Sequence, residues 1–376
     1  MKYYLIAGEA SGDLHASNLI RELVKQDSLA ELRGFGGERM EKAGMQLTKH
    51  YRDMAFMGFL PVLLNLKKIK ENFARCEQDL LQFKPDVLIL VDYPGFNLRM
   101  AAFAKKHGIR VFYYISPKIW IWKKQRIKKI KAFVDEMFTI LPFETAFYRT
   151  LDYEVNYVGN PVLDEVASKP PKAAFKEFAK ENGLSEKPII ALLPGSRLQE
   201  IKSLLPRMLE GASAFDTHQL VVTAAPSVDE SVYQNLLENY QVALLAEKTY
   251  EVLQQADVAV LASGTVSLEA GILQCPQIVC YRMDGGALFY WIGKYVVGIS
   301  LVSLVNLILK RMAVKELLQH RCTAENIRKE LKLILTDTTH RKQMAESYDE
   351  LRQKLGEPGA SERAACMMIR KMSENK

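Results

Sequence analysis

The feature that most constrains the fold is a repeated unit: a short apolar run, then a turn, then a helical pattern. The runs DVLILV (86–91) and RVFYYI (110–115) show it most clearly. Nearly continuous apolar character over such a short stretch is typical of a strand that is buried on both faces. Because such strands alternate with helical patterns, we predict an α/β protein with doubly wound, parallel sheets.

The alternation stops at a polar seam and then restarts, which indicates two domains. The seam covers residues 164–188 and contains the pair Pro170–Pro171. Before it, strands are predicted at 3–7, 86–91, 110–115, 136–141 and 155–158. After it, strands are predicted at 189–193, 219–223, 242–245, 258–261 and 277–280. A length of 376 residues also suits two domains better than one.

We therefore predict two Rossmann-like domains that face a cleft, an arrangement of the GT-B type. The first domain is expected at 1–165 and the second at 166–340. The tail, 341–376, is helical and charged and is broken by GEPGAS (356–361). We expect it to pack back on the first domain or on a partner subunit, so a homodimer is left open. Ligands of parallel sheets collect at the carboxyl ends of the strands, so those loops are the candidate sites.

Composition narrows the class of protein. The five cysteines are scattered with no C-x-x-C pair, and no H-E-x-x-H pattern occurs, so neither a disulfide framework nor a zinc site is expected. The scattered cysteines favour a reducing cytoplasm, and the first residues are expected to enter a strand and not a secretory signal. The apolar segment 287–309 is interrupted by Lys294 and is expected to be buried or interfacial. A net charge of +7 suits an anionic partner without choosing among nucleotide, phosphorylated substrate, membrane and nucleic acid.

The second domain carries two turns suited to phosphate. In LLPGSR (192–197), Gly195 and Ser196 allow backbone amides to approach a ligand at a helix start, and Arg197 adds a forked cation. An ordinary turn with a surface arginine is the alternative. Two such turns in one domain favour a nucleotide site.

The second of these turns lies in LASGTVSLE (261–269). Small residues, hydroxyls and amides again stand at a helix start, and a carboxylate follows that could accept hydrogen bonds from ribose hydroxyls. The predicted nucleotide residues of this turn are Ser263, Gly264, Thr265, Ser267 and Glu269. The alternative is a capped helix in which Ser263 is the N-cap and Glu269 interacts with the helix dipole.

The first domain carries acids at the corresponding positions. Asp92 follows the buried strand at 86–91, where it could act as a general base toward a hydroxyl, or else start a Pro-Gly turn. GEASGD (8–13) follows the first strand, and its Glu9 and Asp13 would repel a phosphate. We therefore expect this loop to bind sugar hydroxyls, with capping of the next helix by Ser11 or Asp13 as the plain alternative.

Two segments of the first domain combine apolar and basic residues. The stretch 118–131 has seven basic residues and no acids, and its first half includes Trp120, Trp122, Lys123 and Lys124. The stretch 56–70 joins an apolar block, including Phe56, Met57, Phe59 and Leu60, to three lysines. A solvated basic helix and a core helix are the plain interpretations. Together the two stretches favour an anionic membrane surface, and nucleic-acid binding ranks lower.

Short motifs along most of the chain resemble one enzyme family. They are GEASGD (8–13), MG (57–58), KPDV (84–87), DYPGFN (92–97), YYISPKIWIW (113–122), LPFE (141–144), VGNP (158–161), LLPGSR (192–197), LASGTVSLE (261–269), YRM (281–283) and VKELLQ (314–319). In this order the chain resembles bacterial lipid-A-disaccharide synthases, which are inverting GT-B glycosyltransferases. SLVN (303–306) departs from the family pattern, which has proline before the asparagine.

The resemblance implies a reaction. UDP-2,3-diacylglucosamine and 2,3-diacylglucosamine 1-phosphate would give a β-1,6-linked disaccharide 1-phosphate and UDP. The enzyme would work at the cytoplasmic side of the inner membrane of a Gram-negative bacterium, as a peripheral protein, with no metal or other cofactor. The runner-up is a GT-B relative that acts on another UDP-N-acetylglucosamine-type substrate, either a peptidoglycan glycosyltransferase or a UDP-sugar epimerase.

The resemblance also implies roles for residues. Asp92 would take the proton from the acceptor, assisted by Glu9, while Arg197 and the amides near Gly195 and Ser263 would stabilise departing UDP. Glu269 would hold the ribose. Arg282 and Asn306 would complete the nucleotide side. The acceptor or sugar would be bound by Ser11, Gly12, Asp13, Asn97 and Ser116.

Overall fold

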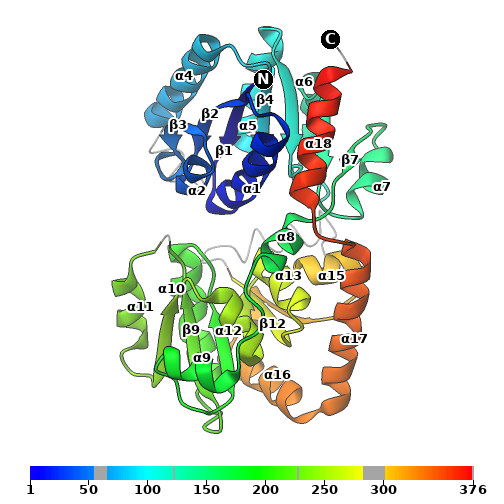
Figure 1. Ribbon diagram of the computed structural model, residues 1–376. Coiled ribbons are helices and arrows are strands. Elements are labelled where there is room, and N and C mark those ends of the chain that lie inside the picture. Colours follow the sequence, from blue (N-terminus) through cyan, green and yellow to red (C-terminus); the bar gives the residue numbers. More distant parts are fainter. Residues whose placement is uncertain (55–65, 122, 227, 283–300, 375–376) are drawn as a thin grey trace. The chain divides into compact units, whose positions relative to one another are not determined.

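The chain forms two compact α/β units, each built on one parallel sheet with helices on both faces (Figure 1). The computed structural model describes residues 1–54, 66–121, 123–226, 228–282 and 301–374. Unit 1 contains residues 1–164 and 357–376, and unit 2 contains residues 165–356. Helix α8, Pro161–Ala167, carries the chain from the first unit to the second.

The sheet of unit 1 has seven parallel strands in the order β3-β2-β1-β4-β5-β6-β7. They are β1 (Lys2–Ala7), β2 (Glu31–Gly36), β3 (Gln46–His50), β4 (Val87–Val91), β5 (Arg110–Tyr114), β6 (Glu136–Thr139) and β7 (Asn156–Tyr157). The apolar runs that dominate the sequence occupy the centre of the sheet, where both faces are covered. This order is the one expected of a dinucleotide-binding fold, and it reverses direction between β1 and β4.

The helices of unit 1 divide between the two faces of its sheet. They are α1 (Ala10–Gln26), α2 (Glu38–Lys42), α4 (Leu66–Phe83), α5 (Pro94–Lys106), α6 (Ile127–Phe133), α7 (Glu144–Arg149) and α18 (Ala360–Ser373). Side chains alternate along β1, so Tyr3 joins the core under α1 and α18 while Tyr4 joins the core under α4 and α5. Both tyrosines are fully buried.

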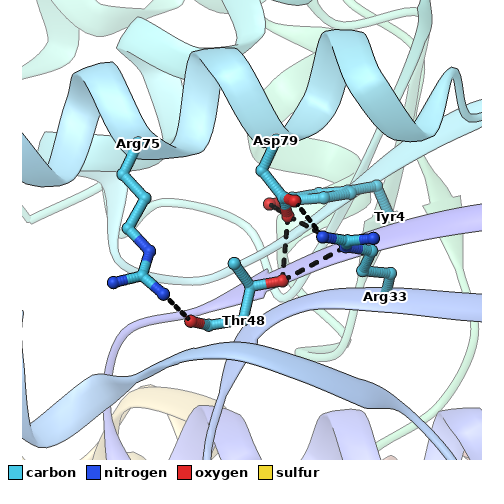
Figure 2. Close-up of polar contacts among 5 residues, drawn as sticks. All are labelled: Tyr4, Arg33, Thr48, Arg75 and Asp79. Carbon is cyan, nitrogen blue, oxygen red and sulfur yellow. Dashed lines mark hydrogen bonds and ion pairs between the residues drawn. The ribbon is translucent and has the colours of Figure 1, made fainter.

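Helix α4 is fastened to the sheet by a polar network (Figure 2). Asp79 of α4, which is 6 % exposed, accepts hydrogen bonds from the hydroxyls of Tyr4 (2.7 Å) and Thr48 (2.8 Å). Its other oxygen pairs with Arg33 of β2. Arg75, one turn earlier on the helix, donates to the carbonyl of Thr48 at 2.9 Å. The network links three neighbouring strands to one helix.

The last helix completes unit 1. In Figure 1, α18 lies beside α1, and Ala364, Ala365 and Met368 enter the same core as Leu19 of α1. Asp164 caps α18, because its carboxylate accepts from the backbone N–H groups of the first turn at 2.6 to 3.0 Å.

The sheet of unit 2 has six parallel strands in the order β10-β9-β8-β11-β12-β13. They are β8 (Ile189–Leu193), β9 (Gln219–Ala224), β10 (Val242–Ala246), β11 (Ala256–Ala262), β12 (Gln277–Tyr281) and β13 (Lys315–Leu318). Its helices are α9 (Phe175–Glu181), α10 (Leu198–Ala212), α11 (Glu230–Leu237), α12 (Thr249–Gln255), α13 (Thr265–Ile272), α15 (Leu304–Leu309), α16 (Ala324–Thr336) and α17 (Thr338–Leu355). The order repeats that of unit 1 and reverses between β8 and β11.

The structure adds strands that the sequence analysis did not predict. β2, ELRGFG, is interrupted by glycines, β3, QLTKH, is mostly polar, and β13, KELL, is short. β3 and β13 are edge strands, which need less apolar character because one side has no neighbouring strand. The tail at 341–376 also divides between the units: α17 belongs to unit 2 and only α18 packs on unit 1.

Candidate active site

Two predicted catalytic residues follow neighbouring strands at the reversal point of unit 1. β1 pairs with β4 in parallel, with Ala7 opposite Val91. Glu9 stands just beyond the first strand and Asp92 directly after the second. The sequence places these acids about 80 residues apart, and sheet order brings them to one edge, where α/β folds bind their ligands.

The backbone at Asp92 is strained and held in place. Asp92 and Tyr93 both have left-handed φ angles, 43° and 44°, a conformation that costs on the order of 1 kcal/mol or more for each non-glycine residue. The Asp92 N–H donates to the carbonyl of Tyr114 at 3.1 Å, and its own carbonyl accepts from the Tyr113 hydroxyl. The side chain is half-buried. Such anchored strain is common where a side chain must be aimed at a ligand.

Tyr93 connects the first loop to Asp92. Its ring lies directly over Gly8, and its hydroxyl donates to the carbonyl of Met54 at 2.9 Å. Burial, with a smaller contribution from the Glu9 carboxylate, raises the pKa of Tyr93 to about 12. Glu9 itself is half-buried at the N-cap of α1, where its side chain makes no capping bond. Its backbone carbonyl accepts from the Asp13 N–H at 2.9 Å, which opens α1.

The prediction that Asp13 binds sugar needs correction. Asp13 is 2 % exposed, and its carboxylate accepts from the backbone N–H groups of Gly37 (2.8 Å), Met40 (3.1 Å) and Arg39 (3.2 Å). It caps α2, a helix 25 residues further along the chain, and not the helix in which it lies. Its oxygens are engaged by the scaffold.

Three other predicted acceptor-site residues are also buried in the scaffold. Gly12 packs against Ala7, with 3.4 Å between the position of an added Cβ and the Ala7 Cβ. Asn97 is fully buried and donates to the carbonyls of Val91 (3.2 Å) and Asp92 (2.8 Å). Ser116 is buried and donates to Glu144. In this structure these residues support the strand ends, and their contact with sugar stays a prediction. Ser11 is half-buried, and its role stays a prediction.

The two predicted phosphate turns meet at the reversal point of unit 2. β8 pairs with β11, with Leu193 opposite Leu261, so the turn at 194–197 and the turn at 263–265 follow adjacent strands. Gly195 has φ +106°, which favours glycine. Arg197 is about half exposed, and its guanidinium lies 3.3 Å from a carboxylate oxygen of Glu200.

Glu200 was not predicted, although it stands three residues after Arg197 on the same helix turn. A Cβ added to Gly195 would lie 2.5 Å from the Glu200 carboxylate, so this carboxylate occupies the space that a side chain at position 195 would need. The i, i+3 spacing of an acid and an arginine was the available signal. Glu200 orients the arginine and reduces the positive charge of this turn.

The second turn supplies a helix start. Ser263 is half-buried, Gly264 and Thr265 are exposed, and α13 begins at Thr265. The first-turn amides of a helix are electropositive and suit an anion. Ser267 is different: it is fully buried and its hydroxyl donates to the carbonyl of Gly264 at 2.9 Å. The Ser267 hydroxyl, which we predicted to contact the nucleotide, is therefore used by a hydrogen bond within the turn.

Glu269 has an unusual acidity. It lies on α13 and is half-buried. Burial raises its pKa to about 7, against a lowering by a hydrogen bond with Tyr250. The charge of Glu165 adds to the rise and that of Lys169 opposes it. A carboxylate that titrates near neutrality at a strand-end site is a candidate for ligand binding.

The last two predicted nucleotide residues differ from each other. Arg282 is half-buried directly after β12 and donates to the carbonyl of Gln319 at 3.3 Å. Asn306 is fully buried; its amide group donates to the carbonyl of Val314 (2.8 Å) and to Glu316 (2.7 Å). Its oxygen accepts from the N–H groups of Ala313 and Val314. Asn306 therefore fixes the loop before β13, and its predicted place on the nucleotide wall is corrected.

The predicted membrane-facing residues are only partly described. Phe56, Met57, Phe59, Leu60 and Trp122 lie outside the described residues. Trp120 is half-buried, with its ring edge-on to Phe143 at 5.0 Å, while Lys123 and Lys124 are exposed. Among the helices of the described ranges, none combines the length and apolar character needed to cross a membrane.

The fold and the strand-end sites define the class: a protein of the GT-B type with two Rossmann-like units. Solved structures with this fold include a UDP-GlcNAc 2-epimerase from Neisseria meningitidis bound to UDP-GlcNAc (TM-score 0.69, 14 % identity, 98 % of this chain and 100 % of that one). The calicheamicin glycosyltransferase CalG4 is also similar (TM-score 0.62, 13 % identity, 99 % and 98 %). At this identity the likeness concerns the fold alone.

Sequence relatives give the particular family. The family model for lipid-A-disaccharide synthetase matches residues 3–370. The lipid-A-disaccharide synthase of Myxococcus xanthus (strain DK1622) is 40 % identical over 96 % of this chain and 95 % of its own length. That of Syntrophus aciditrophicus (strain SB) is 39 % identical over 97 % and 96 %. The chain belongs to the lipid-A-disaccharide synthase family and is a glycosyltransferase of lipid A disaccharide synthesis. The epimerase alternative is not favoured.

Proposed function

We propose that the chain transfers diacylglucosamine from UDP-2,3-diacylglucosamine to the 6-hydroxyl of 2,3-diacylglucosamine 1-phosphate. The bond from the anomeric carbon to UDP breaks as the acceptor oxygen attacks from the opposite face, so the configuration inverts. The hydroxyl proton goes to a carboxylate, and UDP leaves as the second product. One observation carries the proposal: acids stand at the strand-order reversal of unit 1 and phosphate-type turns at that of unit 2.

Asp92 is the proposed proton acceptor. Its backbone is held by Tyr113 and Tyr114, while its side chain keeps access to solvent. That combination suits a base, which needs both fixed geometry and contact with the hydroxyl. Glu9 is the proposed orienting group, because it follows β1, which pairs with β4, and so stands at the same edge of the sheet as Asp92.

UDP is proposed to bind unit 2. Amides at Gly195 and at Ser263–Thr265, with the Arg197 guanidinium, would stabilise charge on the departing diphosphate. Glu269 is proposed to accept hydrogen bonds from the ribose hydroxyls. Arg282 stands at the next strand end, after β12. We propose no metal and no further cofactor for this transfer.

The test measures UDP release on mixing both diacyl sugars. D92N is expected to lower kcat by at least about 100-fold, as removal of a general base usually does, with UDP affinity unchanged by calorimetry. Asp86 is the matched control, because it stands at the opposite end of β4 and its carboxylate accepts from the Lys2 N–H at 2.7 Å. D86N should keep wild-type kcat. Near-normal turnover by D92N would refute the base assignment.

We further propose that the protein works as a peripheral protein on the cytoplasmic side of the inner membrane. Support comes from a basic surface, defined by the exposed lysines Lys123, Lys124, Lys128, Lys129 and Lys131. Ile130 of α6 is buried, and Lys128, Lys129 and Lys131 on the same helix face water. Exposed cations of this kind attract anionic headgroups.

Vesicle sedimentation tests this surface. K128E/K129E should reduce binding to vesicles that contain phosphatidylglycerol and leave the weak binding to phosphatidylcholine vesicles unchanged. K329E/K332E is the control, because these exposed lysines lie on α16 of unit 2. Equal loss in both double variants would show that total charge and not the basic surface controls binding.

A further inference from the structure

Glu144 is a buried carboxylate that four donors share. It begins α7 and is 1 % exposed. One oxygen accepts from the Ser116 hydroxyl and from the Trp120 indole N–H (3.4 Å). The other accepts from the backbone N–H groups of Ile140 (3.1 Å) and Leu141 (2.8 Å). An unprotonated carboxylate can accept from all of them at once, because it carries lone pairs and no donor.

The segment that Glu144 holds is the loop 115–120. Ile119, near the end of the loop, is fully buried, and the Tyr148 hydroxyl of α7 donates to the Pro117 carbonyl at 3.3 Å. Trp120 lies edge-on to Phe143 and stays partly exposed. Helix α7 and the loop therefore form one packed piece whose outer surface includes an indole.

This piece begins at the strand end next to Asp92. β5 pairs with β4, and the loop leaves β5 at Tyr114, whose carbonyl accepts from the Asp92 N–H. The neighbouring Tyr113 donates its hydroxyl to the Asp92 carbonyl. A shift of the loop would therefore move the backbone of Asp92, the proposed base.

We propose that Glu144 is a positioning residue for the transfer reaction: it holds loop 115–120 as a wall of the acceptor-sugar site. Trp120 is the side chain that this wall offers to the acceptor. The inference rests on the proposed function, because it needs the acceptor sugar to bind at the strand ends of unit 1. Glu144 is too deeply buried to touch the substrate itself, so its effect passes through the loop.

The acidity of the group is consistent with this role. Burial raises the pKa of Glu144 above its ordinary value, and the hydrogen bonds from Ser116, Leu141, Ile140 and Trp120 limit the rise. Removing a donor brings the carboxyl closer to protonation, and a protonated carboxyl can no longer accept from every remaining donor.

The experiment compares E144Q, W120F and the double variant. In E144Q the amide oxygen can still accept from the two backbone N–H groups, but the amide nitrogen cannot accept from Trp120. We expect the acceptor KM to rise about tenfold or more in either single variant, with donor KM changed less than about twofold. The double variant should be less than additive, because both substitutions break the same bond.

Tyr4→Phe is the matched control. Like W120F, it removes one donor to a buried carboxylate of unit 1, here the 2.7 Å bond to Asp79 (Figure 2). Y4F and W120F should lower Tm by similar amounts. Only W120F should raise the acceptor KM. An equal rise in both would reduce Glu144 to a general stabiliser and overturn the proposal.

Amide hydrogen exchange gives a readout that does not need turnover. Protection of Ile140 and Leu141 should be kept in E144Q and lost in E144A. If E144Q leaves the acceptor KM at the wild-type value while Tm falls, the proposal is wrong. If instead D92N turns over normally but E144Q still raises the acceptor KM, the base assignment fails and the positioning role stands.

Discussion

Gly8 and Tyr93 are in direct contact across the edge of the unit 1 sheet, with no room for a side chain at position 8. A Cβ added to Gly8 would lie 2.2 Å from Cδ1 and 2.3 Å from Cγ of the Tyr93 ring. Because the ring is attached to the residue after Asp92, this contact sets the distance between the two loops that carry Glu9 and Asp92. Gly8, the first glycine of GEASGD, thus serves packing between loops, and phosphate binding is not needed to explain it.

Substitution G8A is expected to be destabilising and to lower turnover. The added methyl must push Tyr93 away, and overpacking of this kind typically costs about 1–3 kcal/mol. Urea unfolding and UDP release measure the two effects. Gly95 is the control, because a Cβ there meets nothing within 4 Å, and G95A should match wild type. Wild-type stability and kcat in G8A would contradict the contact.

Substitution D13N should reduce stability and leave acceptor affinity unchanged. Asparagine replaces one of two accepting oxygens by a donor, which then faces a backbone N–H of α2. An unsatisfied buried group costs about 1–3 kcal/mol. Thermal unfolding and acceptor KM separate the two possibilities. A raised acceptor KM at unchanged Tm would restore Asp13 as a sugar ligand.

Glu269 should make both UDP affinity and stability depend on pH. Its pKa of about 7 in the folded protein lies above the ordinary value of 4.5, so the folded state binds the proton more tightly than the unfolded one. Stability from this group is therefore present at low pH and falls as pH rises from about 4.5 to 7. UDP affinity should change in the opposite direction, because only the ionised carboxylate accepts from both ribose hydroxyls.

Calorimetric titration with UDP between pH 5.5 and 8.5 tests Glu269, with E269Q as the reference. UDP phosphate titrates in the same way with both proteins, so the difference between the two curves isolates the carboxyl. Parallel curves would remove Glu269 from the ribose site.

Substitution N306A should mainly lower the stability of the folded protein. The side chain is fully buried and connects Ala313, Val314 and Glu316, so truncation leaves several polar groups unsatisfied, at a cost of at least about 2 kcal/mol. Chemical denaturation of the whole chain, followed by far-UV circular dichroism, measures it. If stability is unchanged while UDP affinity falls, Asn306 belongs to the nucleotide site after all.

Substitution R197A should lower UDP affinity and leave stability nearly unchanged, the reverse of N306A. The guanidinium is about half exposed and is paired with Glu200 on the same helix turn, an arrangement worth little to stability. Tm should stay within about 1 °C of wild type, since a change of a few tenths of a kcal/mol moves it little. UDP affinity should fall at least about tenfold, because a charged contact to diphosphate is lost. R321A, at an exposed arginine of unit 2, is the control and should bind UDP normally.

The amino-acid sequence by itself determined the fold class, the position of most central strands and the family. Apolar runs such as 86–91 and 189–193 indicate strands that are buried on both faces, and the small residues after them indicate turns. Both can be predicted from sequence because each depends on residues that are neighbours in the chain. The same signals missed β2, β3 and β13. Glycines interrupt the first of these strands, and the other two are edge strands with weaker apolar patterns.

Only the tertiary structure decided which strands are neighbours and which polar side chains the backbone uses. The pairing of β1 with β4 and of β8 with β11 brings the acids together and the turns together, and local periodicity carries no information about such pairs. Asp13, Asn97, Ser116, Ser267 and Asn306 match ligand-binding patterns in sequence, yet their partners are buried groups of the same unit. Whether a polar side chain faces a ligand or an unsatisfied N–H depends on burial, which the chain acquires only when it folds.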